Sequence, residues 1–157
     1  EKYAKECYDL VESLGVKDVE FTGRVNVRDY LGKMDFTLLT SISEGQPLTI
    51  LESYAAHKPV ITTDVGNCRE LIYGNEDGFG DAGILTHIMN IEEIAHAMVN
   101  MSINEENRKR MGEAGYKRVN AFYRIDQMKD VYREIYKGFS DSQNLSWTEE
   151  PFKINGH

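Results

Sequence analysis

Two glutamates stand eight positions apart in the stretch SEGQPLTILE, residues 43–52. Glu44 comes directly before a Gly-x-Pro turn, and Glu52 lies in the apolar run that follows. Most glutamates in helices only face water. A carboxylate near the amino end of a helix has another use, because it can accept two hydrogen bonds from a vicinal diol such as ribose. The pair is therefore either two solvated charges or two contacts of one site.

The residues between these glutamates have features of a phosphate site. Gly45 removes a side chain where a ligand could approach the backbone. Pro47 suits the first position of a helix, and the N–H groups of Leu48, Thr49 and Ile50 would then have no partner inside that helix. Such N–H groups and the helix dipole bind phosphate or diphosphate. An ordinary helix start explains the same residues, but two carboxylates beside a phosphate are unfavourable unless they meet hydroxyls, which indicates a sugar nucleotide.

The composition limits the classes of function. The 157 residues suffice for one domain, and the net charge of −8 argues against a general nucleic-acid binder, which needs a basic stripe. The scattered histidines and the lack of a D-x-D motif indicate no metal, and we expect no cofactor beyond a substrate nucleotide sugar. No apolar run approaches the length of a membrane span. Cys7 and Cys68 fit no metal or redox spacing, so we expect buried or half-buried thiols in a reducing cytoplasm.

The pattern of apolar residues predicts a sheet that must position the two glutamates. The expected strands cover residues 19–22, 35–41, 59–63 and 83–86. Helices are expected between them, and further helices follow, two of them capped by Asn90 and Asn104. Strands and helices that alternate with short connections predict an α/β fold, a parallel sheet with helices on both faces. Ligands bind at the carboxyl ends of such strands. The loops at that edge are residues 23–25, 41–49 and 63–67.

From residue 3 to 138 the chain resembles the carboxyl-terminal half of a retaining glycosyltransferase of family 4 (group 1). The likeness rests on VEFTGRV, on DFTLLTSISEGQPLTILESYAAHKPVITTDVGNCRELI, and on the later GILT, RKRMGEAGYKRV and YREIY. SISEGQPL is most similar to the Pel exopolysaccharide glycosyltransferase branch, because Gln46 stands where most members have Phe. The resemblance implies a Rossmann-like parallel sheet, here a truncated carboxyl-terminal half of the two-domain GT-B fold. Residues 1–138 would be the donor-binding domain without its first strands, and 139–157 a polar tail.

The resemblance also implies roles for single residues. Glu44 would contact the hydroxyls of the donor hexose and position it for reaction, and Glu52 would hold the ribose. The diphosphate and sugar would be bound at Gly45, Gln46, Pro47, Leu48 and Thr49. The base would be met by the backbone at Gly23, Arg24 and Val25. A plain turn is the preferred interpretation of Gly66 and Asn67, and Lys58 and Arg69 are interpreted as solvated charges at helix ends.

The implied activity is transfer of a hexosyl unit, with retention, from a UDP-linked sugar to a glycan or lipid-linked acceptor. The implied setting is polysaccharide or exopolysaccharide biosynthesis in the cytoplasm, in a membrane-associated synthase complex, without metal or nucleic acid. The family's domain begins with further strands that carry a basic Arg–Lys pair, and its acceptor domain is separate. Neither is visible here, so we expect the isolated chain to transfer no sugar and its exposed sheet edge to favour self-association.

Other functions remain open at this point. Another GT-B enzyme, such as an epimerase or a sugar phosphorylase, would share the fold, although a phosphorylase needs a cofactor lysine that the chain does not show. A non-catalytic flavodoxin-like nucleotide-binding or interaction module would share it too. The sugar, the base and the acceptor are not specified by the sequence. One departure from the family lies at His57, where a small residue, usually Gly, is expected.

Overall fold

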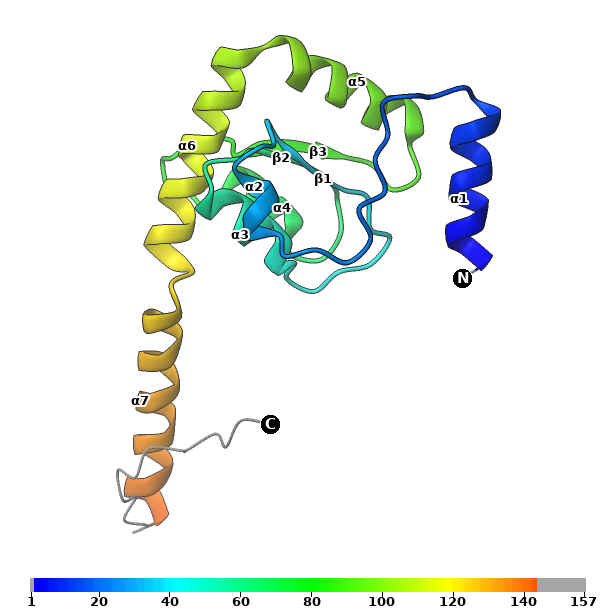
Figure 1. Cartoon of the computed structure of the whole chain (residues 1–157). Helices are drawn as coiled ribbons and strands as arrows, with labels where there is room; N and C mark the ends of the chain where they lie inside the picture. Colours follow the sequence, from blue (N-terminus) through cyan, green and yellow to red (C-terminus); the bar gives the residue numbers. More distant parts are fainter. Residues whose placement is uncertain (1, 144–157) are drawn as a thin grey trace. The chain divides into compact units, whose positions relative to one another are not determined.

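The computed structural model describes residues 2–143 and divides the chain into two compact units (Figure 1). Unit 1 ends at Tyr30 and unit 2 begins at Leu31. The short helix α2 (Arg28–Leu31) spans this boundary. Each unit is described by itself below.

Unit 1 consists of the helix α1 (Lys2–Ser13) and an irregular segment. The ring of Phe21 packs edge-on against that of Tyr8, with centroids 4.5 Å apart. The strand expected at residues 19–22 is wrong, because this segment has no strand conformation. A strand needs a neighbour to pair its N–H and C=O groups, and no described segment pairs with this one.

Unit 2 contains a parallel sheet of three strands in the order β1-β2-β3. The strands are β1 (Thr37–Leu39), β2 (Val60–Thr63) and β3 (Gly83–Thr86). They lie within the predicted ranges 35–41, 59–63 and 83–86, so the parallel α/β fold is confirmed. The central strand β2 is buried throughout, whereas β1 forms an edge on which Leu38 is 42% exposed.

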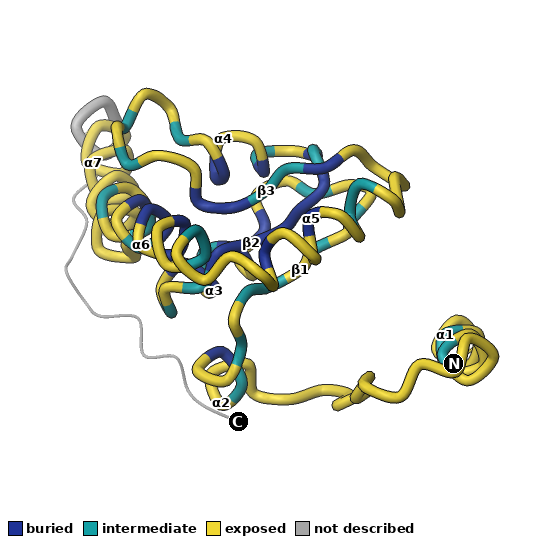
Figure 2. Tube along the Cα trace, turned by 90° about the horizontal axis from the view of Figure 1, so that it is seen from above, coloured by how far each residue is buried: buried dark blue, intermediate teal, exposed yellow. Residues whose placement is uncertain are grey.

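Helices cover both faces of this sheet, as predicted. In Figure 1 the helix α5 (Ile91–Ile103) lies above the sheet, and α3 (Leu48–Ala55) and α4 (Cys68–Tyr73) lie below it. Neighbouring residues of β2 belong to different cores: Val60 to one with α3 and α4, and Ile61 to one with α5. Figure 2 shows the buried residues of β2 and β3 between these helices. Burial on both faces is thus complete for the central strand β2 but not for the edge strand β1.

The helix α6 (Glu105–Phe122) approaches α3 very closely. A Cβ atom at Gly112 would lie 2.2 Å from the carbonyl oxygen of His57. A Cβ atom at Gly115 would lie 2.4 Å from the ring of Tyr54. The two glycines of RKRMGEAGYKRV are therefore required by the packing of α6 on α3.

The ends of the later helices follow local rules. Asn90 accepts a hydrogen bond from the N–H of Glu93 at 3.1 Å, and Asn104 accepts one from Asn107 at 3.0 Å, so both predicted caps are confirmed. The last helix, α7 (Ile125–Gln143), runs past the boundary predicted at residue 138. Residues 144–157, which include Trp147, lie outside the described residues. None of the described helices combines the length and the apolar character needed to cross a membrane.

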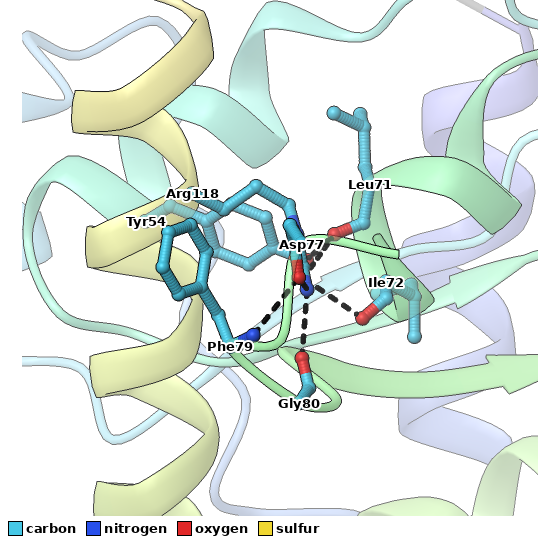
Figure 3. A network of polar contacts seen from close by, with 7 residues as sticks. All are labelled: Tyr54, Leu71, Ile72, Asp77, Phe79, Gly80 and Arg118. Atoms are coloured by element: carbon cyan, nitrogen blue, oxygen red, sulfur yellow. Dashed lines mark hydrogen bonds and ion pairs between the residues drawn. The ribbon is translucent and has the colours of Figure 1, made fainter. Parts of the chain in front are cut away.

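A buried ion pair fastens the segment between α4 and β3 (Figure 3). The Arg118 and Asp77 side chains are 1% and 3% exposed, and Arg118 Nε donates to Asp77 Oδ2 at 2.6 Å. The same guanidinium donates to the carbonyls of Leu71, Ile72 and Gly80 and to Asp77 Oδ1. All five of its N–H groups thus have acceptors. The hydrogen bond from Arg118 holds the pKa of Asp77 below its usual range.

Candidate functional site

The loops that follow β1 and β2 meet at the carboxyl edge of the sheet. The N–H of Asn67 donates to the carbonyl oxygen of Gly45 at 2.8 Å. The hydroxyl of Thr63, the last residue of β2, donates to the carbonyl oxygen of Ser41. The structure therefore brings together the predicted loops 41–49 and 63–67, both of which lie in unit 2.

Glu44 lies half-buried at this junction. The Ser41 hydroxyl donates to its Oε1 atom at 2.7 Å. Within the described residues, no side chain or backbone group donates to its Oε2 atom. One oxygen of the carboxylate is thus held by the protein, and the other can accept a hydrogen bond from a ligand.

Gly66 fixes the backbone of the Glu44 loop. A Cβ atom at Gly66 would lie 2.1 Å from the carbonyl oxygen of Glu44 and 2.5 Å from that of Gly45. Its φ of +50° also lies in the left-handed region that favours glycine. The plain turn expected here is therefore also a packing contact. A Cβ at Gly45, by contrast, would meet nothing within 4 Å, so the approach of a ligand to Gly45 stays a prediction.

The amino end of α3 offers free backbone donors. Pro47, with φ −72°, is the N-cap residue rather than the first residue of the helix. No acceptor for the N–H groups of Leu48 and Thr49 is found among the described residues. The expectation for Ile50 is wrong, because its N–H donates to the carbonyl of Pro47 at 3.2 Å. Two amides, rather than three, are thus available to an anion.

Glu52 is exposed on α3. It follows Leu48 by four residues, so the two share a face of the helix. Within the described part of the chain, its carboxylate forms no ion pair or hydrogen bond. Glu44 and Glu52 therefore stand before and after the free amides in the chain, with carboxylate oxygens that the protein leaves unused.

The family model of the glycosyl transferases group 1 matches residues 1–118. The chain belongs to this family. One relative is an uncharacterized glycosyltransferase of Methanocaldococcus jannaschii, 30% identical over 143 residues, which cover 87% of this chain and 39% of the relative. Another is the N-acetyl-alpha-D-glucosaminyl L-malate synthase of Bacillus anthracis, 32% identical over 129 residues, with 81% and 32% covered.

A solved structure shows the same fold. HepE of Anabaena, crystallised in complex with UDP, superimposes with a TM-score of 0.77 at 21% identity, over 87% of this chain and 37% of HepE. The group 1 glycosyl transferase chain is thus a Rossmann-like α/β domain of GT-B type. It spans about a third to two fifths of the length of these proteins.

The predicted base contacts of this glycosyl transferase domain lie in unit 1. Gly23 has a φ of +64°, in the left-handed region, and Arg24 and Val25 are exposed. Because the site around Glu44 belongs to unit 2, contact of these residues with a base stays a prediction.

Gln46 and Leu48 line a mainly apolar cavity of about 740 Å³ between α3 and the junction of α6 with α7. Tyr123 also lines this cavity. Burial raises the pKa of Tyr123, and the nearby charge of Glu70 adds to that rise. Contact of Gln46 and Leu48 with a diphosphate stays a prediction.

Neither Arg69 nor Lys58 faces the free amides at the start of α3 as an unpaired cation. Arg69 forms an ion pair with Asp64, and this hydrogen bond raises its pKa. Lys58 precedes β2 and so lies toward the amino edge of the sheet, opposite the site. Among residues 2–143, no cluster of three or more His, Cys, Asp and Glu side chains is placed to hold a metal ion. Cys7 is half-buried and Cys68 buried, and both are free, as expected.

The sequence places Ser41 and Thr63 in the predicted loops 41–49 and 63–67, but it assigned neither of them a role in the site. Ser41 stands three residues before Glu44, a spacing at which a serine hydroxyl often bonds a nearby group in the same loop. The spacing of three residues could therefore have indicated the hydrogen bond between Ser41 and Glu44. Thr63 gave no such indication, because its partner Ser41 lies 22 residues earlier, in the loop after β1.

Proposed function

We propose that this chain is the donor-binding part of a retaining glycosyltransferase of family 4. The whole protein would move a hexosyl unit from a nucleoside diphosphate sugar to a glycan or lipid-linked acceptor. The observation that carries the proposal is the pair of free N–H groups at Leu48 and Thr49, which the chain places between a half-buried and an exposed carboxylate, Glu44 and Glu52.

Each group has a task in this chemistry. The free amides at the start of α3 would bind the diphosphate and stabilise its charge as it departs. The Oε2 atom of Glu44 would accept a hydrogen bond from a hexose hydroxyl and so hold the reacting carbon in place. Glu52 would accept hydrogen bonds from the ribose. Gly23, Arg24 and Val25 would meet the base. None of these roles requires a metal or a further cofactor.

UDP is the first nucleotide to consider, because the structural relative HepE was crystallised with UDP. A role in exopolysaccharide biosynthesis, in the cytoplasm and beside a membrane-associated synthase complex, is supported by the similarity of SISEGQPL to the Pel branch. The acceptor would bind to another part of the protein, since the site described here serves the donor. For that reason we expect the isolated chain to transfer no sugar.

Calorimetry tests the site directly. The full-length natural protein should bind UDP, and comparison with GDP and ADP should identify the base. Glu52→Ala should weaken UDP binding about tenfold, because a hydrogen-bond acceptor for the ribose is lost. Glu106→Ala, at an exposed position on α6, is the matched control and should leave UDP affinity unchanged. The assignment fails if no nucleoside diphosphate binds, or if Glu52→Ala binds UDP as the wild type does.

A further inference from the structure

We infer that Ser41 is a positioning residue that orients the carboxylate of Glu44 toward the donor sugar. The inference rests on the proposed role of Glu44 as a hexose contact. It assigns to Ser41 a function in the reaction, although Ser41 itself touches Glu44 rather than the substrate.

The hydroxyl of Ser41 is the protein's contact with the Glu44 carboxylate within the described residues. It donates to Oε1 at 2.7 Å, a short charge-assisted hydrogen bond. A free glutamate side chain has three rotatable bonds and samples many rotamers. The bond to Ser41 selects among these rotamers and leaves Oε2 for the sugar.

Ser41 is in turn held by the core of the sheet. Its carbonyl oxygen accepts a hydrogen bond from Thr63, which is 1% exposed at the end of β2. The backbone of Glu44 lies against Gly66, in the loop that follows the same strand. The backbone of the Glu44 loop is therefore fixed by contacts with the loop after β2, whereas the side-chain direction of Glu44 depends on the Ser41 hydroxyl.

Loss of the Ser41 hydroxyl should therefore affect turnover of the donor sugar but not the affinity for UDP. Removal of the Ser41 hydroxyl leaves the backbone contacts of the loop in place, and it leaves the free amides of α3 unchanged. The affinity for UDP, which lacks the hexose, should therefore be unaffected. Reaction of the hexose should suffer, because its contact is no longer held in one orientation.

The experiment uses the full-length natural protein with UDP-glucose and UDP-N-acetylglucosamine as donor probes. Release of UDP by hydrolysis gives kcat and KM without an acceptor, and calorimetry gives the Kd for UDP. Ser41→Ala should lower kcat about tenfold, the loss typical of a hydrogen bond to a charged group, with the Kd for UDP unchanged. Ser41→Thr keeps the hydroxyl and should restore kcat. Ser43→Ala, at an exposed position of the same loop, is the matched control and should behave as the wild type.

The outcomes separate this inference from the proposed function. If Glu44→Gln lowers kcat but Ser41→Ala does not, the positioning role is overturned and the role of Glu44 stands. An equal loss in Ser41→Ala and Ser41→Thr, or a matching loss of UDP affinity, would indicate a structural effect and would overturn the inference. If Glu44→Gln hydrolyses both donors as the wild type does, the proposed role of Glu44 fails and the inference fails with it.

Discussion

Two polar regions of unit 2 differ in how far the protein satisfies them. In the network of Arg118 and Asp77, all five guanidinium N–H groups have acceptors, and both side chains are nearly inaccessible (Figure 3). In the region of Glu44, one carboxylate oxygen has a donor and the other has none among the described residues. The free amides of α3 add to this unused capacity.

The difference separates a structural role from a binding role. A buried polar group with every partner in place contributes to the folded state and offers nothing to a ligand. A donor or acceptor that has no protein partner and lies in a surface loop can gain a hydrogen bond only from water or from a ligand. Changes in the first region should therefore reduce stability, and changes in the second should reduce binding or turnover.

The largest expected effect is that of Asp77→Asn on stability. This change leaves Arg118 buried without a counter-charge, and such uncompensated charges cost about 4 kcal/mol in the free energy of unfolding. Urea denaturation measures the loss. Asp126→Asn removes one partner of an exposed ion pair with Arg124 and serves as the matched control, with an expected change below about 1 kcal/mol. Equal effects of the two changes would show that the buried pair does not act as described.

Glu44→Gln should give the opposite pattern. The shape of the side chain is kept and its charge is lost, so stability should change little. Turnover of a donor sugar by the full-length protein should fall about 100-fold, as is typical when a positioned polar group is removed. UDP affinity should stay near that of the wild type. A loss of UDP affinity larger than the loss of turnover would exchange the roles proposed for Glu44 and Glu52.

The stability that the Asp77–Arg118 pair contributes should depend on pH. The pKa of Asp77 is lowered in the folded state by its hydrogen bond with Arg118. Its contribution to stability is therefore complete above the unfolded-state pKa of about 3.9 and is lost as the pH falls through the lower folded-state pKa. Urea denaturation between about pH 5 and pH 2 should show this loss in the wild type. In Asp77→Asn the acid-induced loss should be smaller, and an identical pH dependence would contradict the assignment.

Features that depend on neighbouring residues in the chain were predictable from the sequence. The caps at Asn90 and Asn104 are such features, because donor and acceptor lie three residues apart. The strands β2 and β3 were also predictable, since PVITT and GILT combine β-branched and apolar residues between turn residues. In the candidate site, Glu44 and the amino end of α3 could be recognised for the same local reasons.

Features that depend on distant contacts were not predictable. Residues 19–22 have the composition of a strand, but a strand also needs a paired neighbour. Arg118 is one of 18 basic residues, and its burial follows from the packing of α6 against the loop after α4. The need for glycine at Gly66 arises from a carbonyl oxygen that lies 22 residues earlier in the chain.

The smallest expected effect concerns His57, at the end of α3 away from the site. Its φ of +57° lies in the left-handed region, which suits the glycine that the resemblance implies at this position. His57 offsets this strain by stacking on Tyr116, with ring centroids 3.7 Å apart, and by placing Nδ1 3.2 Å from Glu113 Oε2. His57→Ala keeps the strain and loses these contacts, so it should destabilise the protein by about 1 kcal/mol.

His57→Gly removes the strain together with the contacts, and its stability in urea should lie within about 0.5 kcal/mol of the wild type. Neither variant should alter UDP affinity, because the free amides and Glu44 lie at the opposite end of α3. If both variants were equally destabilised, the contacts of His57 rather than its backbone conformation would set its contribution. A change in UDP affinity would mean that the two ends of α3 are coupled, and the separation between structural and binding regions would then not hold for this helix.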